Sequence, residues 1–140
     1  MNKSKILLLT ITTVALLSAC VDKEKGKLNN RAIDFWKFKI EKRFDKAYEF
    51  LSPGWRSGES KESYVLRMGQ SKIKWTDVKV AKKTCSQKDL CQLLLEITYL
   101  YKFKGAVSEK MEITTQVSEN WLLKDNNWYH VPIKKNIIKR

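Results

Sequence analysis

The stretch from Cys91 to Lys104 reads CQLLLEITYLYKFK and alternates in character with a period of two. One face of an extended chain would carry the more apolar set, namely Leu93, Leu95, Ile97, Tyr99, Tyr101 and Phe103. The other face would carry a mixed set, namely Leu94, Glu96, Thr98, Leu100, Lys102 and Lys104. Because alternate side chains of a strand point to opposite faces, this stretch predicts a long, half-buried β-strand.

The same period appears on both sides of this strand. Upstream, the apolar residues Ile73, Trp75, Val78 and Val80 alternate, with a phase slip at Thr76-Asp77 that predicts a β-bulge. After Gly105, a third strand would carry Met111, Ile113, Thr115, Val117, Trp121 and Leu123 on one face. Residues 124–127 (KDNN) predict a hairpin turn into a last strand over residues 128–133. Four antiparallel strands are therefore expected.

Helical spacing precedes the strands. Residues 31–42 predict a helix capped by Asn29 or Asn30, with Ile33, Trp36 and Ile40 on its apolar stripe. Residues 44–51 predict a second short helix, or a bent continuation, ending at Ser52-Pro53-Gly54. A third segment begins after Ser60 and stops at Gly69. The expected fold class is α+β, with two to three N-terminal helices packed on a curved four-stranded antiparallel sheet.

The N-terminal residues have the pattern expected of an export signal. Lys3 and Lys5 flank the start of an apolar stretch over residues 6–17, which is shorter than the roughly 20 residues needed to cross a bilayer. It ends in Leu17-Ser18-Ala19-Cys20, which resembles the lipobox of bacterial lipoproteins. The resemblance implies a signal peptide over residues 1–19, cleavage between Ala19 and Cys20, and a diacylglyceryl group on Cys20. The alternative is an ordinary secretory signal in which Cys20 is incidental.

The residues after Cys20 bear on location. We expect residues 20–30 to be a lipidated, charged and flexible tether. In lipoprotein signals of this kind, an Asp directly after the lipidated Cys retains the protein in the inner membrane. Val21 holds that place and Asp22 follows it. The resemblance therefore implies the cell envelope and, in a cell with two membranes, the outer membrane facing the periplasm.

The two remaining cysteines agree with export. The chain has three Cys, and lipidation of Cys20 would leave Cys85 and Cys91 as a pair. Exported proteins can keep disulfides, so we expect this pair to bridge the first β-hairpin. The Cys85-x₅-Cys91 spacing does not fit a redox motif, and the single His130 cannot complete a zinc site with two cysteines. No metal or cofactor is expected.

Two segments of the mature chain resemble a known superfamily. They are residues 45–56 (DKAYEFLSPGWR) and the final hairpin, with Glu119-Asn120-Trp121 followed by KDNNWY over residues 124–129. Residues 30 to 133 resemble the nuclear transport factor 2-like (cystatin-like) superfamily, which implies a cone-shaped sheet around a long helix over residues 31–133. That superfamily includes isomerases, dehydratases, cyclases and non-catalytic binding modules, so the fold does not choose the function.

Candidates for chemistry are few. Enzymes of the superfamily place an Asp, often with a His or Tyr, inside the cone, which directs attention to Asp34 and His130. We expect Asp34 at the flank of its helix, and a lone strand histidine is more often satisfied than catalytic. The sequence lacks G-x-S-x-G, a glycine-rich phosphate loop and H-E-x-x-H, so we expect no enzyme. Residues that could line a pocket or its lip, with core packing as the alternative, are Trp36, Trp55, Tyr99, Tyr101 and His130.

The charge balance suggests partners. The chain carries 28 Lys+Arg against 15 Asp+Glu, with basic residues along the first strand and a basic tail over residues 134–140. An exported protein meets little nucleic acid, so we expect the partner to be anionic lipid, wall polymer or another protein. We expect a non-catalytic binding or adaptor module. The alternatives are a hydrophobic-ligand carrier or isomerase-like enzyme using the cone cavity, and a basic surface that binds anionic lipid or wall polymer.

Overall fold

A computed structural model describes residues 27–102 and 110–133. The chain divides into two units, residues 1–31 and Ala32–Arg140, and the sheet, the helices α2 to α4 and the cavity discussed below belong to the second unit. The expected signal peptide, the lipobox with Cys20, and the basic tail over residues 134–140 lie outside the described residues. None of the described helices is long and apolar enough to cross a membrane.

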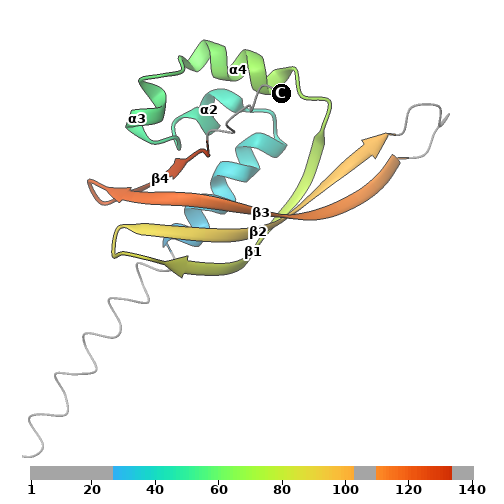
Figure 1. Cartoon of the computed structure of the whole chain (residues 1–140). Helices are drawn as coiled ribbons and strands as arrows, with labels where there is room; N and C mark the ends of the chain where they lie inside the picture. The colour runs from blue at the N-terminus through green and yellow to red at the C-terminus, as the bar shows by residue number, and fades with distance from the viewer. Residues whose placement is uncertain (1–26, 103–109, 134–140) are drawn as a thin grey trace, which may run out of the picture. The chain divides into compact units, whose positions relative to one another are not determined.

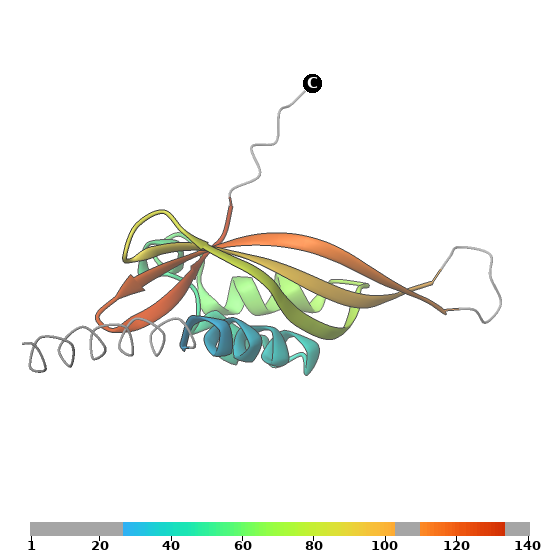
Figure 2. The same cartoon turned by 90° about the horizontal axis from the view of Figure 1, so that it is seen from below.

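The second unit contains a four-stranded antiparallel sheet in the order β1-β2-β3-β4 (Figure 1). The strands are β1 (Lys74–Cys85), β2 (Leu90–Lys102), β3 (Lys110–Lys124) and β4 (Asn127–Val131). The sheet is curved, and the helices of the unit lie on one face of it (Figures 1 and 2). The predicted α+β class with four antiparallel strands is confirmed.

Local irregularities fix how the strands pair. The bulge predicted at Thr76-Asp77 is present as a register shift between Trp75 and Asp77, and a second shift follows between Val80 and Lys82. The β3–β4 turn places Asp125 at φ 49° and Asn126 at φ 60°. Positive φ at both central residues is typical of the two-residue hairpin turn whose twist matches the strands. Asn and Asp tolerate this conformation, so the turn prediction is confirmed.

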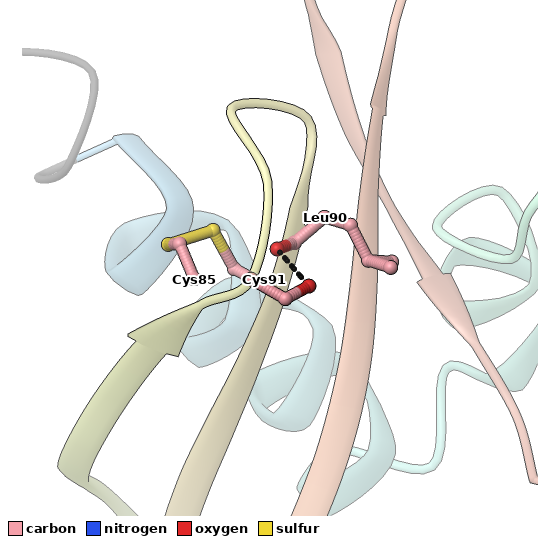
Figure 3. Close-up of a disulfide and its surroundings, with 4 residues drawn as sticks. Cys85, Leu90 and Cys91 are labelled. Carbon is pink, nitrogen blue, oxygen red and sulfur yellow. Dashed lines mark hydrogen bonds between the residues drawn. A yellow bond between two sulfur atoms is a disulfide. The ribbon is translucent and has the colours of Figure 1, made fainter.

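The disulfide joins the ends of the first hairpin. Cys85 and Cys91 are register partners in β1 and β2 and are bonded to each other (Figure 3). Within the loop they enclose, the Ser86 backbone N–H donates a hydrogen bond to the Leu90 carbonyl at 3.1 Å. The predicted bridge is confirmed, and it holds the register of β1 on β2 at this end.

The first helix begins earlier than its sequence pattern suggests. Residues 27–40 are helical, so the prediction that Asn29 or Asn30 caps the helix is wrong. Lys42 ends this helix by adopting φ 58°, and the Arg43 N–H donates to the Phe38 carbonyl at 2.8 Å. A residue in the left-handed region is a common helix stop. The chain then starts a separate helix, α2 (Phe44–Tyr48), rather than a bent continuation.

Ser52 and Pro53 start a helix as well as separating two. Ser52 is extended (φ −59°, ψ 148°), and its hydroxyl accepts a hydrogen bond from the Trp55 N–H of the one-turn helix α3 (Pro53–Arg56). Pro is favoured at the first helical position because its missing N–H has no partner there in any case. Trp55 therefore lies in a short helix. The last helix, α4 (Lys61–Gly69), has the Ser60 cap expected from the sequence.

The first helix packs on the sheet with a face that includes a lysine. Its buried residues in the second unit are Ala32, Phe35, Trp36 and Lys39, whereas Ile33 and Ile40 are only half-buried. The Phe35 ring meets the Trp121 ring edge-on, with centroids 6.0 Å apart. The apolar stripe predicted on Ile33, Trp36 and Ile40 is therefore rotated by about one residue. The consequence is that Lys39 points toward the core.

Candidate functional site

Glu119 is a buried acid in the middle of the core. It lies on β3 opposite Leu93, on the same face as Trp121, and is 5% exposed. Its Oε1 accepts a hydrogen bond from Trp36 Nε1 at 3.0 Å, and its Oε2 accepts one from Trp121 Nε1 at 3.2 Å. Each carboxylate oxygen thus has a neutral indole donor.

Lys39 is the buried cation of the same region. Its side chain reaches the face of Trp36, with Nζ 3.3 Å from the ring centroid, and the Phe35 and Trp75 rings lie at 5.0 Å each. Its ammonium has no hydrogen bond or ion pair with the described residues. Aromatic faces attract a cation, but they do not replace a hydrogen-bond acceptor. Lys39 is therefore held in place by ring contacts while its N–H donors stay free.

Burial and charge act in opposite directions on this pair. Burial lowers the pKa of Lys39 to about 8, against the negative charge of Glu119, which raises it. Burial also raises the pKa of Glu119, opposed by the Lys39 charge and by the hydrogen bonds from Trp36 and Trp121. Each residue therefore keeps the other closer to its charged form than burial alone would allow.

His130 lies beside this pair on β4. Its backbone N–H donates to the Phe50 carbonyl at 2.7 Å, and its own carbonyl accepts from the Ser52 N–H at 2.8 Å. Its Nε2 is 3.7 Å from Glu119 Oε1, and its Nδ1 is buried without a hydrogen-bond partner. Burial, with a smaller effect of the Lys39 charge, lowers the pKa of His130 to about 3. The ring is neutral near pH 7.

These groups border a cavity of about 530 Å³ within the second unit. Phe35, Lys39 and His130 line it from the first helix and β4. The segment running through α3 and α4 contributes most of the rest, namely Gly54, Trp55, Gly58, Glu59, Tyr64, Arg67 and Met68, and Leu51, Pro132 and Ile133 complete the lining. The cavity thus lies between the first helix, the α3–α4 segment and the end of β4.

The other charged side chains of the cavity are paired with each other. Arg67 donates from Nε to Glu59 Oε1 at 2.7 Å and from Nη2 to Glu59 Oε2 at 2.8 Å. Trp55 Nε1 donates to the same carboxylate at 3.2 Å. The hydrogen bond from Arg67 is the main reason that the pKa of Glu59 is lowered. Among the described residues that line the cavity, Lys39 is therefore the cation without a contacting acid.

The structure brings together some of the residues singled out from the sequence and separates others. Trp55 and His130 line the cavity. Trp36 is buried in contact with Lys39 and does not line the cavity. Tyr99 and Tyr101 lie further along β2 and do not line it either, and Tyr101 is 45% exposed. Asp34 is exposed and lies 3.9 Å from Lys37. Within residues 27–102 and 110–133 no group of three or more His, Cys, Asp or Glu side chains is placed to hold a metal ion.

Sequence reasoning missed Lys39 and Glu119, although both have a periodic signal. Lys39 follows Ala32, Phe35 and Trp36 at the i, i+3, i+4, i+7 spacing of one helix face. Glu119 has the same parity as Val117 and Trp121 in β3. Both were overlooked because a charged residue is usually assigned to the solvent side.

The basic residues of β1 do not form a surface of one sign. Lys79 lies opposite Glu96 on the outer face and 3.7 Å from Asp77, while Lys83 lies opposite Leu93 on the side of the sheet that faces the helices. Charges of both signs therefore share the outer face of the sheet.

Comparison with known proteins identifies no relative by sequence: neither a family model nor a curated protein matches the chain. Among solved structures, a SEC-C motif containing protein from Rhodopseudomonas palustris is similar over 69% of each chain, with 13% sequence identity and a TM-score of 0.49. A similarity of this size does not assign the chain to a family.

Replacing Glu119 tests whether its carboxylate supports the core. In Glu119→Gln, an amide NH₂ replaces one acceptor oxygen, so one indole N–H loses its partner and Lys39 loses its counter-charge. We expect the free energy of unfolding, measured by urea denaturation, to fall by about 3 kcal/mol. Glu112→Gln, on the exposed side of the same strand, should change it by less than about 0.5 kcal/mol. Equal effects of the two changes would contradict this assignment.

The protonation of His130 can be followed directly, because it is the single histidine of the chain. Its pKa of about 3 predicts that the Hε1 NMR resonance does not titrate between about pH 8 and about pH 5, whereas in concentrated urea it should titrate near pH 6.5. The unfolded chain then binds the extra proton, so this group lowers stability as pH falls from about 6.5 toward 3. A midpoint near 6.5 in the folded protein would show that His130 is not buried beside Lys39 and Glu119.

Proposed function

We propose that the chain is a lipid-anchored protein of the cell envelope whose folded domain binds a small, largely apolar ligand without catalysing a reaction. The observation that carries the proposal is Lys39. Its ammonium borders a cavity of about 530 Å³ and has no acceptor among the described residues. This volume lies within the range of small-molecule sites, which are mostly apolar with a few placed polar groups.

The lining indicates the chemistry of the ligand. Aromatic and aliphatic side chains such as Phe35, Leu51 and Met68 would surround an apolar body. A ligand oxygen in contact with Lys39 would accept a hydrogen bond from a charged group, which is worth about 1.5–3 kcal/mol. The ligand is therefore an apolar molecule with one oxygen-bearing end, such as a carboxylate.

Binding without turnover is the simplest assignment for the groups present. A histidine with a pKa of about 3 is a poor general base near neutral pH, since catalytic bases work best when their pKa lies near the operating pH. Asp34, the acid considered because of the superfamily resemblance, is exposed and is not a lining residue.

The finer assignment of the fold belongs to the same proposal. We infer a nuclear transport factor 2-like domain, because helices cover one face of a curved antiparallel sheet (Figures 1 and 2). The anchor rests on Leu17-Ser18-Ala19-Cys20, and Val21 favours the outer membrane in a cell with two membranes. A surface that binds anionic lipid or wall polymer has less support, because acidic residues share the outer sheet face with the lysines.

Decanoate, an apolar chain with one carboxylate, tests the cavity. We expect calorimetric titration of the full chain to show one binding site, with affinity reduced about tenfold or more in Lys39→Met, because a hydrogen bond to a charged group is worth about 1.5–3 kcal/mol. Lys37→Met, one half-turn away and exposed, is the matched control and should bind like the wild type. Equal affinity for both variants, or no binding to the wild type, would contradict the proposed noncovalent binding at Lys39.

Metabolic labelling tests the anchor. Bacteria that express the full chain should incorporate labelled palmitate into it, and Cys20→Ala should abolish the label because the thioether to the lipid forms on that sulfur. The control is the double variant Cys85→Ala/Cys91→Ala, which removes the other two cysteines and should keep the label. Label retained in Cys20→Ala would exclude the lipobox assignment.

A further inference from the structure

Lys39 combines three features that favour covalent chemistry at its amine. It borders the cavity, it lies among aromatic rings, and its Nζ has no hydrogen-bond acceptor among the described residues. Lysines desolvated in apolar pockets are the usual nucleophiles toward carbonyl compounds. With the pKa of Lys39 at about 8, roughly a tenth of the amine is uncharged near pH 7, against less than about a thousandth for an ordinary lysine.

We propose that Lys39 captures an apolar aldehyde in this cavity as a reversible Schiff base. The proposal rests on the proposed function only in using the same cavity. It adds a covalent bond to a ligand that carries an aldehyde, and apart from Lys39 and the aldehyde it needs no oxidant, reductant or cofactor.

The reaction balances with water as the other product. The Nζ lone pair attacks the carbonyl carbon, the C=O π electrons move to oxygen, and a proton from the nitrogen reaches that oxygen through solvent. The carbinolamine hydroxyl takes up from solvent the proton that the ammonium released on becoming the neutral amine, and it leaves as water while the nitrogen lone pair forms C=N. One ammonium and one aldehyde give one protonated imine and one water, so nothing is oxidised or reduced.

The surroundings of Lys39 suit the product as well as the amine. The protonated imine keeps one positive charge at the same place, so the ring faces of Trp36 and Trp75 continue to stabilise it. Glu119 remains the counter-charge, held by its two indole donors. Capture therefore does not leave either buried charge unbalanced.

The lining also selects among aldehydes. Leu51, Met68 and Ile133 offer no hydrogen bonds from their side chains, and the Glu59–Arg67 pair is already satisfied. A sugar aldehyde would have to bury hydroxyl groups with few partners, at a cost of roughly 1–3 kcal/mol each. Aliphatic or aromatic aldehydes are the class that fits.

Decanal with cyanoborohydride tests the proposal on the full-length wild-type protein near pH 7. The reductant converts an imine to a stable secondary amine, and peptide mass spectrometry then measures the decyl group on each lysine. We expect Lys39 to be labelled about tenfold faster, or more, than the exposed Lys37. Labelling of Lys39 at the same rate as Lys37, or more slowly, would overturn the proposal.

A variant pair checks the site without changing the charge. Lys39→Arg should abolish the fast labelling phase and Lys37→Arg should keep it; a fast phase that survives in Lys39→Arg would overturn the assignment to Lys39. The wild-type map needs no variant, so misfolding of Lys39→Arg does not remove the test. If decanoate binds but Lys39 is not labelled selectively, the covalent capture is refuted and the proposed function stands. If Lys39 is labelled selectively but decanoate does not bind, the noncovalent binding is refuted and the covalent capture stands.

Discussion

The carboxylate of Glu119 connects the elements on which the core depends. Through its two oxygens it joins Trp36 of the first helix to Trp121 of its own strand, and it supplies the negative charge that faces Lys39. His130 of β4 lies beside it. A buried carboxylate without such partners would be strongly disfavoured, so the helix must present Trp36 and Lys39 together at this position. The rotation of the helix on the sheet follows from that requirement.

This arrangement is not the most stable core that the fold could have. Replacing a buried ion pair by well-packed apolar residues is often neutral or stabilising, because desolvation of the charges offsets their attraction. Here the pair is also incomplete, since Lys39 makes no direct contact with the acid and borders a cavity of about 530 Å³. A cation that borders a cavity and has no acid in contact contributes little to the packing of the core, which is why we connect Lys39 with ligand binding.

The strands and turns could be predicted from the sequence because their causes are local. The alternation in β2, the slip at Thr76-Asp77 and the Asp125-Asn126 turn each depend on neighbouring residues, and the structure contains all three. The cavity depends on contacts between distant segments, such as the bridge that pairs Leu51 with His130. The spacing of apolar residues along the sequence does not predict a contact of this kind. The helix face was assigned from apolar residues alone, and the position of Lys39 shows that the charge of a residue is a weaker guide than its spacing.

The two proposed roles of Lys39 are states of one group. As an ammonium it would bind an oxygen acceptor, and as a neutral amine it would attack a carbonyl carbon. Burial favours the neutral amine and the Glu119 charge favours the ammonium, so the pKa near 8 reflects a balance between them. Without the Glu119 charge the pKa of Lys39 would be lower and more of the amine would be neutral; without burial the pKa would be higher and less neutral amine would be present to attack an aldehyde. The acid behind the cavity therefore sets which ligand chemistry Lys39 can use, although it does not line the cavity itself.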